Sequence, residues 1–413
     1  MLGPGLTTGA SDDDPAGIAT YSQAGARYGN QLLWLAGFTF PLMALVQEMC
    51  ARIGLVTGKG LAANIRQYFP RWVLITSTTL LFAANTFNLG ADLGAMANAV
   101  QLLLPTADFT FLVICFAGMS LLLQIFSTYA RYAKYLKYLT MFLFAYVFSA
   151  LLIRGLDWHA VFLSAITPIT TFSRDQIILI CGILGTTISP YLFFWQTSQE
   201  VEEEILQGNT TLAKRQGATN EEIRHMRIDV WVGMFFSNLV MFFIIVACAG
   251  TLFPQGITTI QTAADAAKAL QPFAGNASYL FFALGIIGTG LLAVPVLAGS
   301  ASYAVAESFG WKQGLFYKLN QAYAFYGVLI IAMIIGLLLN FVGIDPIKAL
   351  LYSAVVNGII APLVLVLIIL ISRDKKIMGA WQSGLVTQAC AWIITILMGV
   401  AGLATIAALL PFS

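Results

Sequence analysis

The sequence predicts an all-α integral membrane protein made of two five-helix repeats of inverted topology, followed by an eleventh transmembrane helix. Of the 413 residues, 59% are hydrophobic and only 10% are charged, whereas a soluble domain carries about 25% charged residues. Apolar stretches of roughly 20 or more residues recur along the chain, each long enough to cross about 30 Å of hydrocarbon as a helix. Two of these stretches, five apart in order, are interrupted near their middle, which indicates the repeat.

Polar gaps and turn residues divide the chain into eleven expected spans. They lie at about 2–26, 31–55, 71–103, 109–129, 135–154, 175–199, 228–253, 277–305, 317–341, 347–371 and 381–409. Residues 2–154 and 175–371 would form the two repeats and 381–409 the added helix, within a single transmembrane domain that covers 1–413. The most hydrophilic stretch, 200–227, is expected to be a solvated loop that begins with the acidic residues 202–204.

The basic residues predict the orientation. If the amino terminus is cytoplasmic, only Arg27, Arg154, Arg174, Lys268 and Lys348 of the 21 Lys and Arg residues fall outside the cell, which leaves 16 inside. An odd number of spans then places the carboxyl terminus outside. We therefore expect a multi-pass cell-membrane protein that is monomeric, contacts the lipid bilayer and binds no nucleic acid.

The first interruption reads GASDDDPAGIAT, residues 9–20. A proline inside a helix removes a hydrogen bond and clashes with the preceding turn, so Pro15 is expected to split the span into two half-helices. A carboxylate at the bilayer centre costs at least a few kcal/mol, and no Lys or Arg stands near the break. A bound cation would neutralise it. Asp14 could instead serve only as a helix N-cap before the proline, whereas Asp12 and Asp13 could face water or cap free amides.

The second interruption reads GTTISPYLF, residues 185–193, and repeats the order Gly, Thr-Thr, Ser, Pro of the first break. Discontinuous helices at matching positions of two repeats are typical of transporters that bind their substrate near the bilayer midplane. Thr186 and Ser189 offer hydroxyl and carbonyl oxygens, although they could merely satisfy backbone groups around the proline. Together with Asp14 they form an all-oxygen donor set, which suits magnesium, calcium or manganese better than copper or zinc.

Other polar residues within the expected spans are further candidates. Asp92 in the third span is a functional candidate because ionisable residues are costly in a membrane. Asn357 in the tenth span could contact the ion or form an interhelical hydrogen bond. His159 and His225 are the two histidines, and both are expected in loops, so a proton relay through the membrane would depend on carboxylates.

These motifs resemble those of the natural resistance-associated macrophage protein (Nramp) family of divalent-metal transporters. The family's Asp-Pro-Gly-Asn signature in the first helix resembles DPAGIAT, which starts at Asp14. The stretch after the family's second helix matches CARIGLVTGKGLA, residues 50–62. In the sixth helix, GTTISPYLF stands in place of the family's Met-Pro-His motif. The resemblance covers nearly the whole chain. It implies a leucine-transporter (LeuT) type fold with an eleventh helix and transport of Mn²⁺, Fe²⁺ and similar ions, usually with proton symport.

The resemblance also implies roles for individual residues. Asp14 matches the family's ligand aspartate, and Thr186 stands where a backbone carbonyl coordinates the ion. Asp92 matches a third-helix aspartate implicated in proton transfer. Asn357 matches a tenth-helix glutamine that closes over the metal.

The sequence departs from the family pattern at five positions. Gly17 replaces an asparagine ligand, and Ser189 replaces the methionine whose sulfur favours transition metals. Tyr191 and Gln196 replace histidines, and Ala95 replaces an acidic partner of the third-helix aspartate. The pattern is similar to the Nramp-related magnesium transporters, whose wider site implies a partly hydrated Mg²⁺ and no proton coupling. Because Mg²⁺ gives up its waters reluctantly, we expect the two missing ligands to leave room for water.

The sequence thus predicts an alternating-access carrier of Mg²⁺, and also of Mn²⁺, with the ion as substrate and no cofactor. The membrane potential would drive inward flux at roughly 2.3 kcal/mol per charge per 100 mV. The alternative is a proton-coupled Mn²⁺/Fe²⁺ symporter. An amino-acid carrier is disfavoured because the aspartates would repel a carboxylate. A membrane enzyme is disfavoured because HExxH, serine–base and nucleotide-loop motifs are lacking, and a metal sensor because no signalling domain is present.

Overall fold

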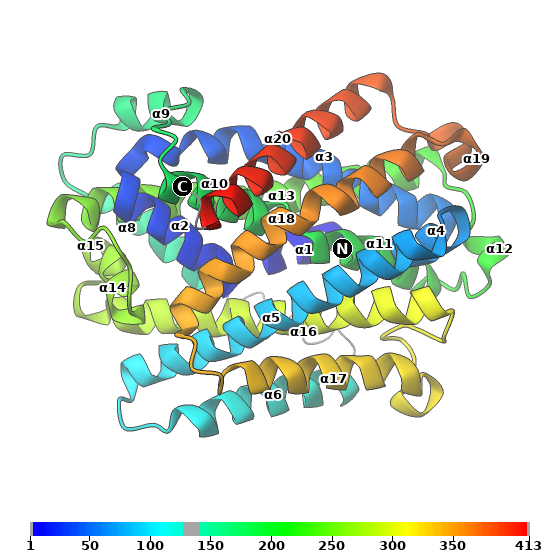
Figure 1. The fold of residues 1–413 in the computed structure, drawn as a ribbon, viewed down its shortest axis with the longest axis horizontal. Coiled ribbons are helices and arrows are strands. Elements are labelled where there is room, and N and C mark those ends of the chain that lie inside the picture. Colours follow the sequence, from blue (N-terminus) through cyan, green and yellow to red (C-terminus); the bar gives the residue numbers. More distant parts are fainter. Residues whose placement is uncertain (1–2, 127–140, 411–413) are drawn as a thin grey trace.

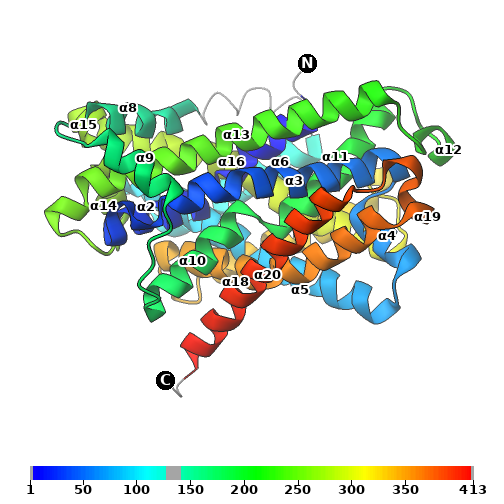
Figure 2. The same ribbon diagram turned by 90° about the horizontal axis from the view of Figure 1, so that it is seen from above.

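The computed structural model describes residues 3–126 and 141–410. Within these residues the chain forms helices joined by short connections, and most of the long helices run side by side along the longest axis of the molecule (Figure 1). Seen from above, α13 and α20 lie on opposite faces of the bundle (Figure 2).

The long unbroken helices are α3 (Trp34–Thr57), α5 (Arg71–Leu103), α6 (Phe109–Phe126), α13 (Asn220–Thr251), α16 (Ser278–Phe309), α17 (Tyr323–Leu339), α18 (Pro346–Arg373) and α20 (Leu385–Leu409). The two broken spans are α1 (Pro4–Asp12) with α2 (Pro15–Tyr28), and α10 (Arg174–Thr187) with α11 (Pro190–Leu206). Shorter helices connect them: α4 (Leu61–Tyr68), α8 (Phe144–Leu152), α9 (Trp158–Ile166), α12 (Leu212–Arg215), α14 (Ala263–Ala267), α15 (Gln271–Ala274) and α19 (Lys375–Met378).

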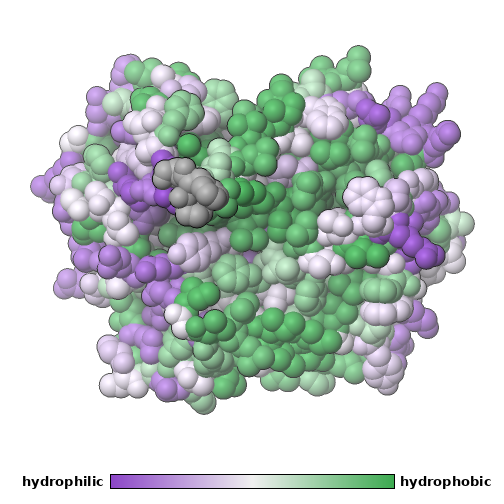
Figure 3. All heavy atoms as spheres, in the orientation of Figure 1, coloured by the Kyte–Doolittle hydropathy of each residue, from purple (hydrophilic) through white to green (hydrophobic). Residues whose placement is uncertain are grey.

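The described helices account for the expected membrane crossings. Among the described residues, eight helical segments are long and apolar enough to span a bilayer. One of them, Arg174–Leu206, contains α10, the break and α11. Met141–Leu152 and Tyr323–Leu339 are shorter apolar helices. The broken α1–α2 pair completes the eleven expected spans, although residue 2 of the first, residues 127–129 of the fourth and residues 135–140 of the fifth lie outside the described residues. A hydrophobic band crosses the middle of the molecular face, and hydrophilic residues gather at both ends of the long axis (Figure 3).

Glycines let the first halves of both broken helices pack very closely on a neighbour. A Cβ at Gly9 of α1 would overlap the carbonyl oxygen of Gly233 on α13. A Cβ at Gly185 of α10 would overlap the backbone of Ala354 and Gly358 on α18. Small residues are the usual means of close helix packing in membranes, so each half-helix is held against a long neighbouring helix.

The expected solvated loop over 200–227 is wrong at both ends. α11 continues through the acidic residues, and both Glu202 and Glu204 are buried. Glu202 accepts hydrogen bonds from the Tyr303 hydroxyl and the Leu315 backbone amide, which replace the lost water. At the other end, a capping box of Thr219 with the glutamate three residues later starts α13 early.

The two histidines also lie in helices rather than loops. The Asp157 side chain accepts hydrogen bonds from the backbone amides of His159 and Ala160, and this cap begins α9. His225 lies in the first turns of α13 and is exposed. Both rings are outside the buried centre of the bundle, so the expectation that imidazole takes no part in a transmembrane relay is unaffected.

Candidate metal site

The two helix breaks meet at the centre of the bundle, and they have the same local construction. Each second half-helix begins with a proline at its first position, and the residue before it, Asp14 or Ser189, is the N-cap. Proline is tolerated there because the first helical N–H has no partner within the helix. The expected division of both spans into half-helices is therefore confirmed.

Asp14 is a buried N-cap whose carboxylate also binds two other helices. Its Oδ1 accepts from the Gly17 backbone amide at 2.7 Å. Its Oδ2 accepts from Asn88 Nδ2 of α5 at 2.9 Å and from the Tyr191 hydroxyl of α11 at 3.4 Å. The residue is 1% exposed, and none of these donors carries a formal charge. The capping interpretation is thus correct, but it leaves the negative charge without a basic partner among the described residues.

Gly17 brings α2 against the end of α10. A Cβ added to Gly17 would lie 3.1 Å from Thr186 Oγ1, 3.3 Å from Tyr21 Cε2 and 3.5 Å from Asp14 Oδ1. The Thr186 side chain and the Tyr21 ring thus fill the space that the glycine leaves. The expectation of room for water at this position is wrong for the arrangement described here, because a hydrated ion would need α2 and α10 to separate.

Ser189 binds backbone oxygens at the end of α10. Its hydroxyl lies 2.8 Å from both the Gly185 and the Thr186 carbonyl oxygens, to which it donates. This bond steadies the second break. It also occupies one lone pair of the Thr186 carbonyl, and the second lone pair stays available to an ion.

Asp92 and Asn357 approach the breaks from other helices. Asp92 is fully buried on α5, one turn after Asn88, and its carboxylate interacts electrostatically with that of Asp14. Asn357 is buried on α18, next to the glycine that packs on α10, and its Oδ1 has no hydrogen-bond partner in the part of the chain that the structure describes. The structure therefore brings both candidates to the same central region as the two breaks.

Asp12 and Asp13 do not face a water-filled vestibule. Ser237 of α13 donates to Asp12 Oδ2 at 2.6 Å, and its hydroxyl lies 3.3 Å from Asp13 Oδ1. Both aspartates are buried. They join the end of α1 to α13, which differs from the expected solvated or amide-capping positions.

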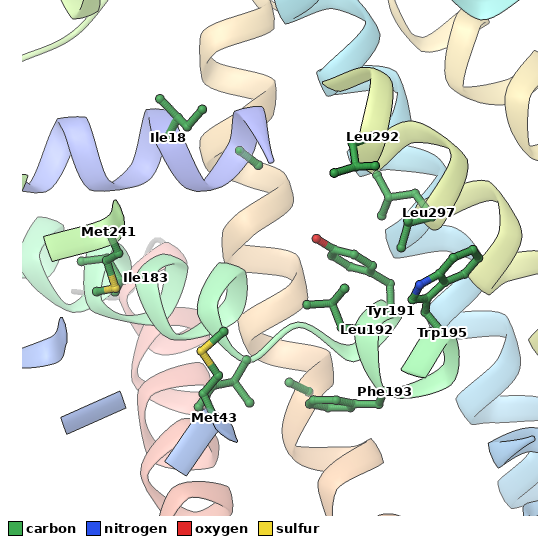
Figure 4. Packing of buried hydrophobic residues seen from close by; sticks show 14 of the residues in the cluster. Ile18, Met43, Ile183, Tyr191, Leu192, Phe193, Trp195, Met241, Leu292 and Leu297 are labelled. Atoms are coloured by element: carbon green, nitrogen blue, oxygen red, sulfur yellow. The ribbon is translucent and has the colours of Figure 1, made fainter. Parts of the chain in front are cut away.

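Sequence reasoning missed Asn88 and the contact that Tyr191 makes. Asn88 stands four residues before Asp92, on the same face of α5, so the helical spacing could have indicated it. Figure 4 shows that the Tyr191 hydroxyl points away from Trp195 and Leu297 and towards α2, the helix that carries Ile18. No local pattern distinguishes such a tyrosine from one that only packs in the core.

The donor set around the breaks is poor in charge. Within residues 3–126 and 141–410, no three His, Cys, Asp or Glu side chains come together in a group that could hold a metal ion. A cation at the breaks would therefore be held by fewer than three such side chains, Asp14 among them, with hydroxyl, carbonyl and amide oxygens around it. Such a set suits a hard ion that is bound only transiently.

Comparison with known proteins identifies the family. The family described as natural resistance-associated macrophage protein-like matches residues 5–408. The chain belongs to the Nramp family. Two curated relatives, each named divalent metal cation transporter MntH, come from Pectobacterium carotovorum and Aeromonas hydrophila. Both are 26% identical over 405 residues, which is 96% of this chain and 92% or 93% of the relative.

Solved structures show the same fold. The Eremococcus coleocola manganese transporter, in complex with an aromatic bis-isothiourea substituted compound, superimposes with a TM-score of 0.74 at 16% identity; the match covers 98% of this chain and 86% of that one. Mhp1, a nucleobase-cation-symport-1 family transporter in a closed conformation, gives a TM-score of 0.57 at 15% identity and covers 99% and 91%. The expected all-helical, LeuT-type membrane fold is confirmed. As an Nramp protein, the chain transports divalent metal cations across a membrane and is not an enzyme.

Proposed function

We propose that this Nramp protein is an alternating-access carrier that brings Mg²⁺, and also Mn²⁺, into the cytoplasm. The membrane potential drives the flux, and proton symport is not required. The observation that carries the proposal is the surroundings of Asp14, whose carboxylate is contacted by an amide side chain, a tyrosine hydroxyl and a backbone N–H. Sulfur and imidazole do not take part in these contacts.

An all-oxygen site suits Mg²⁺, which is usually held by one or two carboxylates and several retained waters. The proposed metal site consists of Asp14, Gly17, Thr186, Ser189 and Asn357, with Asp92 as a secondary path. Gly17 belongs to the site because it adds no side-chain ligand for the ion beside the Asp14 carboxylate. Thr186 would supply its carbonyl oxygen, as the family resemblance implies.

Burial supports alternating access. Because Asp14 is 1% exposed, an ion reaches it only when a half-helix moves. The links between α1 and α2 and between α10 and α11 are each two residues long, and such short non-helical links can act as hinges. We propose that α1 opens the site on one side of the membrane and α10 on the other.

The named relatives favour the alternative, a proton-coupled Mn²⁺/Fe²⁺ symporter. Both curated relatives carry the name MntH, and the solved structure is a manganese transporter. One sulfur also comes near the second break: Met241 Sδ lies 3.7 Å from Thr187 Oγ1. Asp92, which interacts electrostatically with Asp14, could accept a proton.

For the whole chain, we propose one transmembrane domain over residues 1–413, in which about 2–154 and about 175–371 form the repeats and about 381–409 the added helix. The positive-inside rule supports a cytoplasmic amino terminus and an extracellular carboxyl terminus. The working unit is proposed to be a monomer in the cell membrane.

The test is Mg²⁺ uptake into proteoliposomes under an inside-negative potential. The wild-type protein is expected to take up Mg²⁺, and Asp14→Ala is expected to abolish uptake. Asp265→Ala is a matched control, because Asp265 is a half-buried capping-box residue of α14 whose carboxylate hydrogen-bonds to Thr262 and Lys268 rather than to either break. Uptake by Asp14→Ala at the wild-type rate would place the ion elsewhere and refute the site.

A further inference from the structure

A polar stripe runs along α11 from the second break towards the end of the helix. Gln196, Glu200 and Glu203 follow one another at spacings of four and three residues, so they share one helix face. Gln196 and Glu200 stand six and ten residues after Pro190, or about 9 and 15 Å along the axis. Half of the hydrocarbon core is about 15 Å thick, so the stripe leads from the site to the membrane surface.

Gln196 has an unsatisfied amide oxygen. The residue is 0% exposed, and its Nε2 donates to Glu200 Oε1 at 2.8 Å. Its Oε1 has no hydrogen-bond partner among residues 3–126 and 141–410. A buried polar atom that loses water without gaining a partner is costly, so this oxygen is a position where a ligand could compensate the cost.

Glu200 is a buried carboxylate without a basic partner in the described part of the chain. It is 6% exposed, and its described hydrogen bond is the one from Gln196. The charged groups with the largest electrostatic effect on it are Asp229, Glu203 and Glu204, all acidic. A carboxylate in such surroundings favours a bound cation.

Glu48, another buried glutamate at this end of the bundle, is fully partnered. It accepts from Arg52 and Arg227 at 3.0 Å each and from Trp231 Nε1 at 2.8 Å. Burial by itself therefore does not leave a glutamate unpaired here. The lack of a basic partner distinguishes Glu200.

The stripe lies beside the half-helix that the proposed mechanism moves. Asp229 of α13 acts electrostatically on Glu200 and accepts hydrogen bonds from the amides of Gly3 and Gly5 at the start of α1. Further along, the Tyr191 hydroxyl of α11 lies 3.4 Å from the Ser11 carbonyl oxygen near the end of α1. α1 is thus joined to Asp229, whose charge acts on Glu200, and meets α11 at Tyr191, so a displacement of α1 would change the surroundings of the stripe.

We propose that Gln196 and Glu200 form a second divalent-cation site, which an ion occupies after it leaves Asp14. The Gln196 Oε1 and the Glu200 carboxylate bind the ion, and water supplies the remaining ligands, a combination typical of Mg²⁺. Its place on the exit path rests on the proposed function, whereas its existence as a binding site does not.

The test measures Mn²⁺ binding to the purified full-length protein, with the electron paramagnetic resonance signal of free Mn²⁺ as the probe. Asp14→Ala is expected to retain one weak site. Adding Glu200→Gln should weaken the remaining binding at least tenfold. Adding Glu202→Gln should leave it unchanged, because Glu202 is a buried glutamate of the same helix whose carboxylate accepts hydrogen bonds from the Tyr303 hydroxyl and the Leu315 amide.

Gln196→Leu in the Asp14→Ala background provides a second measurement if the Glu200 variant unfolds, and it should also weaken binding. The inference is overturned if Asp14→Ala removes all Mn²⁺ binding, or if neither Glu200→Gln nor Gln196→Leu changes what remains. Retained binding in Asp14→Ala with no cation uptake by the wild-type protein would refute the proposed function and leave the second site standing.

Discussion

Asp229 fastens the amino end of α1 to α13, and weakening this contact should release α1. Its Oδ1 accepts from the Gly3 amide at 3.1 Å, and its Oδ2 accepts from the amides of Gly5 at 2.6 Å and Leu6 at 3.4 Å. These are free amides at the positive end of the helix. Asp229→Asn keeps the shape but removes the charge and turns one acceptor into a donor that faces an N–H group.

The free-energy change follows from these contacts. Hydrogen bonds to a charged group contribute about 1.5–3 kcal/mol each, and a charge at a helix terminus contributes about 0.3–1 kcal/mol. Asp229→Asn keeps one acceptor oxygen, so the loss amounts to one such hydrogen bond and the charge; because Asp229 is half-buried, solvent screening places this loss at the lower end of both ranges, at about 2 kcal/mol. That value corresponds to about a 30-fold rise in the population in which α1 is undocked.

Thiol labelling measures this population. Thr8 of α1 is 0% exposed, so a cysteine placed there reacts only when α1 moves away from the helices that bury it. The less buried native cysteines, Cys115 and Cys390, are first replaced by serine. Asp229→Asn should speed labelling of Thr8→Cys about 30-fold. A labelling rate within about threefold of that of Thr8→Cys alone corresponds to a change of under 1 kcal/mol and would refute the role of Asp229 in holding α1. As a control, Asp265→Asn at the capping box of α14 should leave the labelling rate unchanged.

Three further outcomes are expected. Ser189→Met should shift uptake towards softer ions such as Cd²⁺ in competition assays, and an unaltered selectivity profile would show that position 189 does not face the ion. Asn88→Ala removes a donor that orients Asp14, so the KM for the ion should rise by about 10-fold or more; an unchanged KM would contradict this role. Gly60→Ala places a Cβ on a buried glutamate oxygen and should lower the unfolding free energy by about 1–3 kcal/mol, whereas Gly384→Ala, with open space around it, should unfold like the wild type.

The parts of the fold that local sequence controls could be predicted. The proline after Asp14 and the proline after Ser189 set the two breaks, and hydrophobic length set the spans, because both effects act within one or two helical turns. The N-cap role of Asp14 follows from the same local chemistry. It required no knowledge of which helices lie nearby.

The partners of these residues could not be predicted, because they come from distant parts of the chain. Asn88 is 74 residues from Asp14 in sequence, and Ser237 is 225 residues from Asp12. The same holds for the GKG turn after α3, where Glu307 accepts from the Ala63 amide and so caps α4 from 244 residues away. Periodicity indicates that a residue is buried, but it does not indicate which helix covers it.

The burial of the acidic residues on α11 escaped prediction for the same reason. A run of glutamates is usually solvated, and the sequence does not reveal that Tyr303 and the Leu315 amide hydrogen-bond to Glu202. The room expected beside Gly17 failed because the Thr186 side chain from the other repeat fills that space. Both errors concern tertiary contacts between residues far apart in the sequence.

The most direct test of the account measures Mg²⁺ uptake and luminal pH in the same proteoliposomes, with and without a pH gradient, beside parallel assays with Mn²⁺ and Ca²⁺. The account predicts potential-driven Mg²⁺ uptake at the same rate with or without the gradient, and no change in luminal pH. Absence of Mg²⁺ uptake, or Mn²⁺ uptake that acidifies the lumen, would contradict it and favour the proton-coupled symporter.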